Sequence, residues 1–168
     1  MRKLTLLLFA LAVCFIALPV QAQQRTSPKA EASGTVGGAK VDIVYCRPSA
    51  DKRKIMGGLV PYGEVWRTGA NAATTIEFDK AVKIEGKTLP AGKYALFTIP
   101  NENEWIIVIN KDVNQQGAYN YDEKKDVLRV NVKPKKTDQY VETFTITPEK
   151  DMVNLKWENT QVGFKVKS

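Results

Sequence analysis

The stretch VETFTITPEKDMVNLKWENTQVGFKV, residues 141–166, decides the fold class of this chain. Within it, apolar residues recur at every second position. The side chains that we expect to face inward are Phe144, Ile146, Val153, Leu155, Trp157, Val162, Phe164 and Val166. Side chains alternate between two faces along a β-strand, so this spacing predicts half-buried strands. We place a tight turn at ENT, residues 158–160, between the last two runs.

Turn residues separate similar short runs in the rest of the chain. Gly37-Gly38, Glu85-Gly86 and Pro90-Ala91-Gly92 each lie between such runs. The loop NENE, residues 101–104, separates YALFTI from WIIVI, and both of these runs are apolar on both faces, as central strands are. We therefore predict an all-β fold, a single antiparallel β-sandwich of roughly 8–10 strands. The one helical turn that we allow lies near ADKRKIMGG, residues 50–58.

The first 22 residues have the features of a secretory signal peptide. Arg2 and Lys3 precede an apolar run at residues 4–20, and VQA ends in Ala22 with small residues at the positions that a signal peptidase reads. We expect cleavage after Ala22, which leaves a single sandwich domain at residues 23–168. The sequence therefore predicts a periplasmic or secreted protein with no stable membrane insertion after cleavage.

The absence of histidine excludes several kinds of chemistry. The chain has no His, and cleavage after Ala22 would leave Cys46 as its only cysteine. Ser-His-Asp and Cys-His catalysis, imidazole-bound zinc and thiolate clusters are thereby excluded. We assign no catalytic residue, no cofactor and no metal site, and we interpret Cys46 as an inert residue at a strand end. A hydrolase that uses carboxylates stays as the lesser alternative, with Glu64, Asp79, Glu104 and Asp122 available.

The net charge is moderately basic, with 25 Lys and Arg against 18 Asp and Glu, a formal charge of +7. The densest basic stretch is KKDVLRVNVKPKK, residues 124–136, where Arg129, Asn131 and Lys133 alternate with apolar residues. These side chains form the solvent face of a half-buried strand. Binding of single-stranded nucleic acid would require aromatic residues between these basic residues, and this stretch has none. We expect no nucleic-acid partner.

Two long stretches interrupt the strand pattern, at residues 47–73 and 111–126. Structureless segments of this length in a compact domain are uncommon and are often functional. The first contains LVPYGEVWRTGAN, residues 59–71, and the second contains GAYNYD, residues 117–122. The candidate ligand-binding residues are Tyr62, Trp66, Arg67, Asn71, Tyr119, Tyr121 and Asp122. An aromatic face, a guanidinium and an amide together suit a sugar, a peptidoglycan fragment or a peptide.

The same residues also allow a purely structural interpretation. Trp66 would cap the open end of the sandwich core, and Arg67 would pair with a buried acid such as Asp122 or Asp79. Asn71 would then hold a turn through bonds between its side chain and the backbone.

Three stretches carry a resemblance to a known family: RPSADKRKIMGGLVPYGEVWRTGANAATTIEF, LPAGKYALFTIPNENEW and GAYNYDEKKDVLRVNVKP. In order and spacing they resemble the bacterial domain of unknown function DUF2911, over nearly the whole chain after the signal peptide. The resemblance implies an exported, β-sandwich-like protein and no particular activity. The predicted function is a non-catalytic envelope domain that binds a glycan, a peptidoglycan fragment or a peptide. The alternative is a structural domain with a protein partner.

Overall fold

The computed structural model describes residues 27–168, so the expected signal peptide lies outside the described residues. The strands in this part are β1 (Lys29–Val36), β2 (Ala39–Cys46), β3 (Thr74–Phe78), β4 (Val82–Ile84), β5 (Lys87–Leu89), β6 (Gly92–Ile99), β7 (Trp105–Asn110), β8 (Asp126–Val132), β9 (Lys135–Glu149) and β10 (Met152–Lys167). One short 3₁₀ helix, η1 (Glu123–Lys125), precedes β8.

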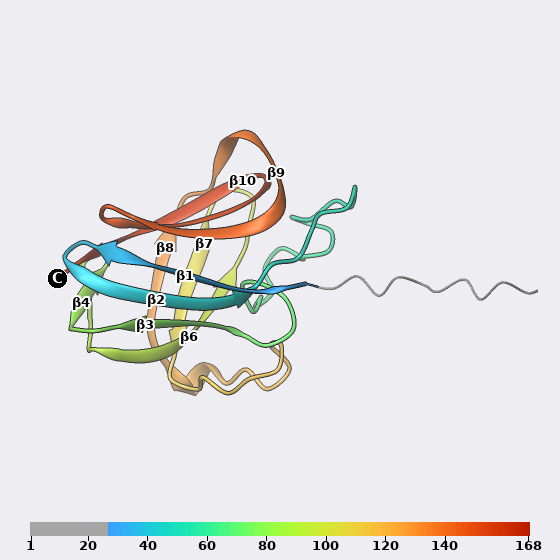
Figure 1. Cartoon of the computed structure of the whole chain (residues 1–168). Helices are drawn as coiled ribbons and strands as arrows, with labels where there is room; N and C mark the ends of the chain where they lie inside the picture. Colours follow the sequence, from blue (N-terminus) through green and yellow to red (C-terminus); the bar gives the residue numbers. More distant parts are fainter. Residues whose placement is uncertain (1–26) are drawn as a thin grey trace, which may run out of the picture.

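The strands form two antiparallel sheets that pack face to face (Figure 1). The larger sheet has six strands in the order β1-β2-β3-β6-β7-β8, and the smaller has four in the order β5-β4-β10-β9. The prediction of an all-β antiparallel sandwich is therefore confirmed. The core between the sheets contains the inward-facing residues that the alternating pattern selected, among them Phe144, Trp157 and Phe164, each 2% exposed or less.

The central strands β6 and β7 are buried on their outer face as well. A second, smaller apolar cluster joins Ala73, Ala95, Phe97 and Val108, and Tyr121 packs against it. Its residues come from β6, β7 and the two long connecting stretches, 47–73 and 111–125. These stretches pack on the outer face of the larger sheet at β6 and β7. The apolar residues of both strands are therefore buried on both faces of the sheet.

Two local predictions are wrong. No turn forms at residues 158–160, because β10 runs unbroken from Met152 to Lys167, with irregularities in its pairing to β9 between Lys156 and Thr160. The buried positions change from odd to even numbers across this irregularity, from Trp157 to Val162. A bulge makes this shift within one strand, whereas the pattern alone suggested a turn. Residues 50–58 form turns and no helix, and the one helical turn in the described chain is η1.

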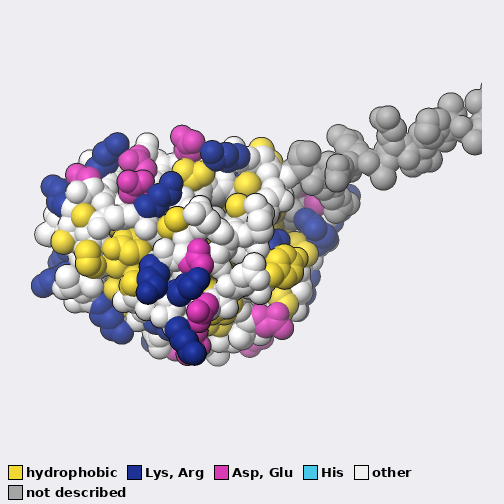
Figure 2. Space-filling view, turned by 90° about the horizontal axis from the view of Figure 1, so that it is seen from below, with side chains coloured by type: hydrophobic (Ala, Val, Ile, Leu, Met, Phe, Trp, Pro, Cys, Tyr) yellow, Lys and Arg dark blue, Asp and Glu magenta, His cyan; other side chains and the backbone are white. Residues whose placement is uncertain are grey.

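The long stretches lie at one end of the sandwich. Figure 1 shows segment 47–73 at the end where β1 enters, opposite the turn between β1 and β2 and the C-terminus. Figure 2 shows one face of the molecule, on which acidic and basic side chains mix and apolar side chains lie in small separate groups. Within residues 27–168 there is no helix of the length and apolarity that a bilayer span requires.

Candidate functional site

Segment 63–74 is held to the end of β6 by backbone hydrogen bonds. Trp66 and Thr98 exchange both of their backbone bonds, at 2.7 and 3.0 Å, and Gly63 N donates to Pro100 O. Thr68 is fully buried in a left-handed conformation, and its carbonyl accepts a 2.7 Å bond from the Thr74 hydroxyl. These bonds fix the direction in which Trp66 and Arg67 leave the backbone.

Trp66 belongs to an aromatic cluster that closes this end of the core. Its ring stacks on Trp157 with centroids 5.8 Å apart, and it meets Phe144 and Trp105 edge-on. The indole Nε1 donates to Gly69 O at 3.1 Å. This is the packing that the structural interpretation of Trp66 describes. Because Trp157 and Phe144 already contact the ring, it offers a ligand an edge or a partial face.

Arg67 lacks the acid partner that the structural interpretation requires. Its Nε is buried and has no hydrogen-bond partner, and the guanidinium makes no ion pair within the described chain. Asp79 accepts a hydrogen bond from Lys40 N instead, and Asp122 accepts one from Lys124 N at the start of η1. The expected pairing of Arg67 with Asp79 or Asp122 is therefore wrong.

The Arg67 side chain lies in the wall of a cavity of about 380 Å³, which we call the Arg67 cavity. Its lining comprises Ser27, Pro48, Arg53, Leu59, Val60, Val65, Trp66, Arg67, Gly69, Ala70, Asn71, Ala118 and Trp157. Among these described residues are two arginines and no carboxylate. Arg53 donates to the carbonyls of Ala50 and Ser49, so its charge is held by backbone oxygens. The guanidinium of Arg67 is the charge in this lining that no oxygen atom of residues 27–168 satisfies.

The second long stretch supports Arg67 through Gly117. This glycine has φ +67°, its N–H donates to Asn71 O at 2.9 Å, and a Cβ added to it would lie 3.0 Å from Arg67 Nη1. Only glycine adopts this conformation without strain and also leaves room for the guanidinium. Sequence reasoning did not select Gly117, because Arg67, the residue beside which it lies, is 50 residues away in the chain.

The predicted site residues of the second long stretch, Tyr119, Tyr121 and Asp122, contribute no side chain to the Arg67 cavity. Tyr119 is 88% exposed, and Asp122 caps η1. The Tyr121 hydroxyl donates to Asp126 Oδ2 at 2.6 Å and accepts from Arg129 Nη2 at 2.7 Å. Burial and the bond to Asp126 raise the pKa of Tyr121 to about 12. This network anchors the loop before β8 and so positions Gly117 and Ala118.

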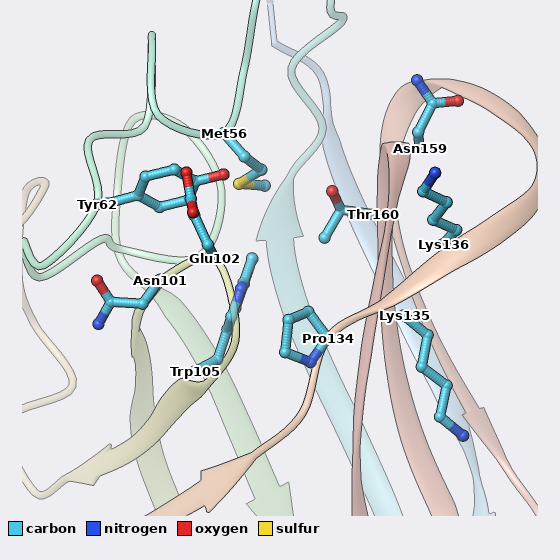
Figure 3. Close-up of a pocket in the computed structure, with 10 residues that line it drawn as sticks. All are labelled: Met56, Tyr62, Asn101, Glu102, Trp105, Pro134, Lys135, Lys136, Asn159 and Thr160. Carbon is cyan, nitrogen blue, oxygen red and sulfur yellow. The ribbon is translucent and has the colours of Figure 1, made fainter.

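Asn71 and Tyr62 occupy different places. Asn71 lines the Arg67 cavity in a left-handed conformation, and its Nδ2 lies 3.4 Å from Ser27 O. Tyr62 lines a second cavity, of about 280 Å³, together with Met56 and Trp105 (Figure 3). The fold thus brings together Trp66, Arg67 and Asn71 of the predicted set, and it separates Tyr62, Tyr119, Tyr121 and Asp122 from them.

A comparison with known protein families determines the family to which this chain belongs. The family described as Protein of unknown function (DUF2911) matches residues 27–166, which is most of the chain. The chain belongs to the DUF2911 family. The resemblance carried by the segment around Trp66 and Arg67 is thereby confirmed. Neither the curated proteins nor the solved structures gave a match to this DUF2911 protein.

The described part of the DUF2911 domain offers few other groups for metal binding or catalysis. No group of three or more His, Cys, Asp or Glu side chains between residues 27 and 168 is placed to hold a metal ion. Cys46 is a free thiol, half-buried at the end of β2. Of the acids that a hydrolase could use, Glu104 accepts a bond from Asn131, while Asp79 and Asp122 are engaged as described above.

Proposed function

We propose that this DUF2911 protein is an exported, non-catalytic binding domain of the cell envelope that holds a carboxylate of its ligand in the Arg67 cavity. The ligand classes are a glycan, a peptidoglycan fragment or a peptide. The observation that carries the proposal is the buried, unpartnered Nε of Arg67 in a cavity whose described lining has no acid. Arg67 as a whole is half-buried, and a buried N–H donor such as its Nε is costly when it has no partner.

A carboxylate fits this guanidinium better than other groups do. The planar fork of arginine offers parallel N–H donors, and a carboxylate accepts two of them at once. Nε is closed to solvent, whereas Nη1 and Nη2 make no hydrogen bond within residues 27–168 and are the two donors that a carboxylate in the cavity can reach. Around it the cavity supplies apolar surface from Val65, Ala118 and the Trp66 edge, and the Asn71 amide lies at its boundary. Such a mixture of apolar walls and few polar groups is typical of small-molecule sites.

Export supports the choice of ligand. Residues 1–22 have the features of a secretory signal peptide, and on these features we propose export. Envelope glycans and peptides that carry free carboxylates are then the compounds that it meets. The non-catalytic part of the proposal rests on the lack of histidine and on the lining of the two cavities, in which Glu102 is the single carboxylate among described residues. A carboxylate hydrolase needs two such groups facing one another.

The test compares acids with their uncharged counterparts. The probes are N-acetylmuramic acid and N-acetyl-D-alanyl-D-alanine, each beside its methyl ester, and the readout is the ¹⁵N resonance of Arg67 Nε together with calorimetry. We expect saturable binding of at least one acid, weaker binding of its ester, and loss of binding in Arg67→Met. Lys80→Met, which removes an exposed charge outside the cavity, is the control and should bind normally.

Two results would contradict the proposal. One is an ester that binds as tightly as its acid, because the carboxylate would then be irrelevant. The other is unchanged binding by Arg67→Met. If neither acid binds, and a partner protein is captured through the Arg67 surface instead, the structural alternative replaces the binding domain.

A further inference from the structure

The second cavity, which we call the Tyr62 cavity, lies between four parts of the chain that are far apart in sequence. Its lining comprises Met56, Tyr62, Asn101, Glu102, Trp105, Pro134, Lys135, Lys136, Asn159 and Thr160. Figure 3 shows Tyr62 and Met56 on one side, Thr160, Asn159 and Lys136 on the other, and Trp105 with Pro134 between them. None of these residues except Tyr62 was selected from the sequence.

The base of this cavity is apolar and its rim is polar. Trp105 is 3% exposed and Met56 8% exposed, and Figure 3 shows Trp105 beside the ring of Pro134. At the rim, Asn101, Asn159 and Thr160 make no side-chain hydrogen bond within the described chain, so their donors and acceptors are free for a ligand. Lys136 and Glu102 add charges of opposite sign on opposite sides.

Tyr62 is held in place by the backbone beneath it. Gly57 has φ +70°, and a Cβ at this position would lie 2.6 Å from Tyr62 Cε2, so the ring is seated directly against the glycine. Tyr62 is nevertheless 37% exposed. A fixed, partly exposed ring at the wall of a cavity loses little conformational entropy when it binds a ligand.

We infer that the Tyr62 cavity binds a sugar ring. A pyranose has apolar C–H faces and a circumference of hydroxyl groups, and it thus matches the apolar base of Trp105, Met56 and Pro134 with the Tyr62 ring in the wall. The side-chain amides of Asn101 and Asn159 each donate and accept, as hydroxyl groups require. Charges of both signs at the rim favour a sugar over a simple anion or cation. The inference is separate from the Arg67 cavity and holds whether or not that cavity binds a carboxylate.

The experiment titrates the protein with four neutral oligosaccharides: N,N′,N″-triacetylchitotriose, maltotriose, xylotriose and mannotriose. Binding is followed by NMR through the side-chain NH₂ signals of Asn101 and Asn159 and the indole N–H of Trp105. We expect saturable shifts of these signals with at least one sugar. Asn101→Ala and Asn159→Ala should each weaken binding about five- to tenfold, the effect of one lost hydrogen bond.

The matched control is Asn103→Ala, in the same loop but outside the lining, which should bind normally. Tyr62→Ala should weaken binding, and Tyr62→Phe should restore the apolar contact and most of the affinity. Arg67→Met should bind sugar as the unaltered protein does, which separates this inference from the proposed carboxylate site. Absence of saturable shifts with all four sugars, or equal effects of Asn101→Ala and Asn103→Ala, would overturn it.

Discussion

The indole of Trp66 stacks on the indole of Trp157, with ring centroids 5.8 Å apart and an interplanar angle of 18°. Trp157 belongs to β10 in the smaller sheet, whereas Trp66 is bonded to β6 of the larger one. The contact therefore joins the two sheets at the end where both long stretches lie. It also forms part of the wall of the Arg67 cavity, so stability and the candidate site depend on the same pair.

The first prediction concerns this pair. Trp66→Ala removes a large ring from the end of the core and should lower the free energy of unfolding by about 3 kcal/mol, at the lower end for aromatic truncations because Trp66 is only partly buried. Urea denaturation followed by circular dichroism measures the change. Tyr119→Ala, at a side chain 88% exposed, is the control and should change stability by less than about 0.5 kcal/mol. Equal effects of the two substitutions would contradict this role for Trp66.

The second prediction concerns the charge of Arg67. Arg67→Met keeps most of the side-chain volume and removes a guanidinium that no acid within residues 27–168 neutralises. Without ligand, the free energy of unfolding should change by less than about 1 kcal/mol, because Arg67 is half-buried and no described ion pair is lost. An arginine in a buried ion pair would instead lose about 3 to 5 kcal/mol on such a substitution. A loss of that size in thermal or urea unfolding would show that Arg67 has a partner in solution.

The third prediction concerns Asp126, whose side chain is 8% exposed. It accepts hydrogen bonds from Asn110 Nδ2, Tyr121 and Arg129 Nε. Asp126→Asn keeps the shape but removes the charge, and it should cost about 1 to 3 kcal/mol, less than for a fully buried pair because Arg129 is partly exposed. Hydrogen exchange should show faster opening of the loop before β8, and unchanged exchange there would rule out an anchoring role.

The fourth prediction concerns pH. Burial and the Asp126 bond raise the pKa of Tyr121 from 10.0 to about 12, so the folded protein holds this proton where the unfolded chain releases it. The stability that Tyr121 contributes is fully present below pH 10 and is lost as the pH rises toward 12. The free energy of unfolding should therefore fall less steeply between pH 9 and pH 12 in Tyr121→Phe than in the unaltered protein. Because other tyrosines also titrate in this range, the difference between the two proteins is the quantity to compare.

Parts of this structure follow from short-range patterns. The alternation in residues 141–147 and 162–166 and the Gly37-Gly38 turn between β1 and β2 depend on neighbouring residues alone, and both were predicted correctly. The change of buried face near Trp157 was visible too. Its cause was not, because a bulge and a turn produce the same break in the pattern, and only the pairing of β10 with β9 distinguishes them.

The sequence by itself determined the alternating layers, the family, and a segment around Trp66 and Arg67 that no strand pattern explains. Only the tertiary structure decided that Trp66 packs on Trp157, that Arg67 has no acid partner among residues 27–168, and that Tyr62 lines a different cavity. The physical reason is range: strand patterns are set by residues one or two positions apart. Whether a charged group such as the Arg67 guanidinium finds a partner depends on groups 50 or more residues away in the chain. No local rule predicts where those groups lie.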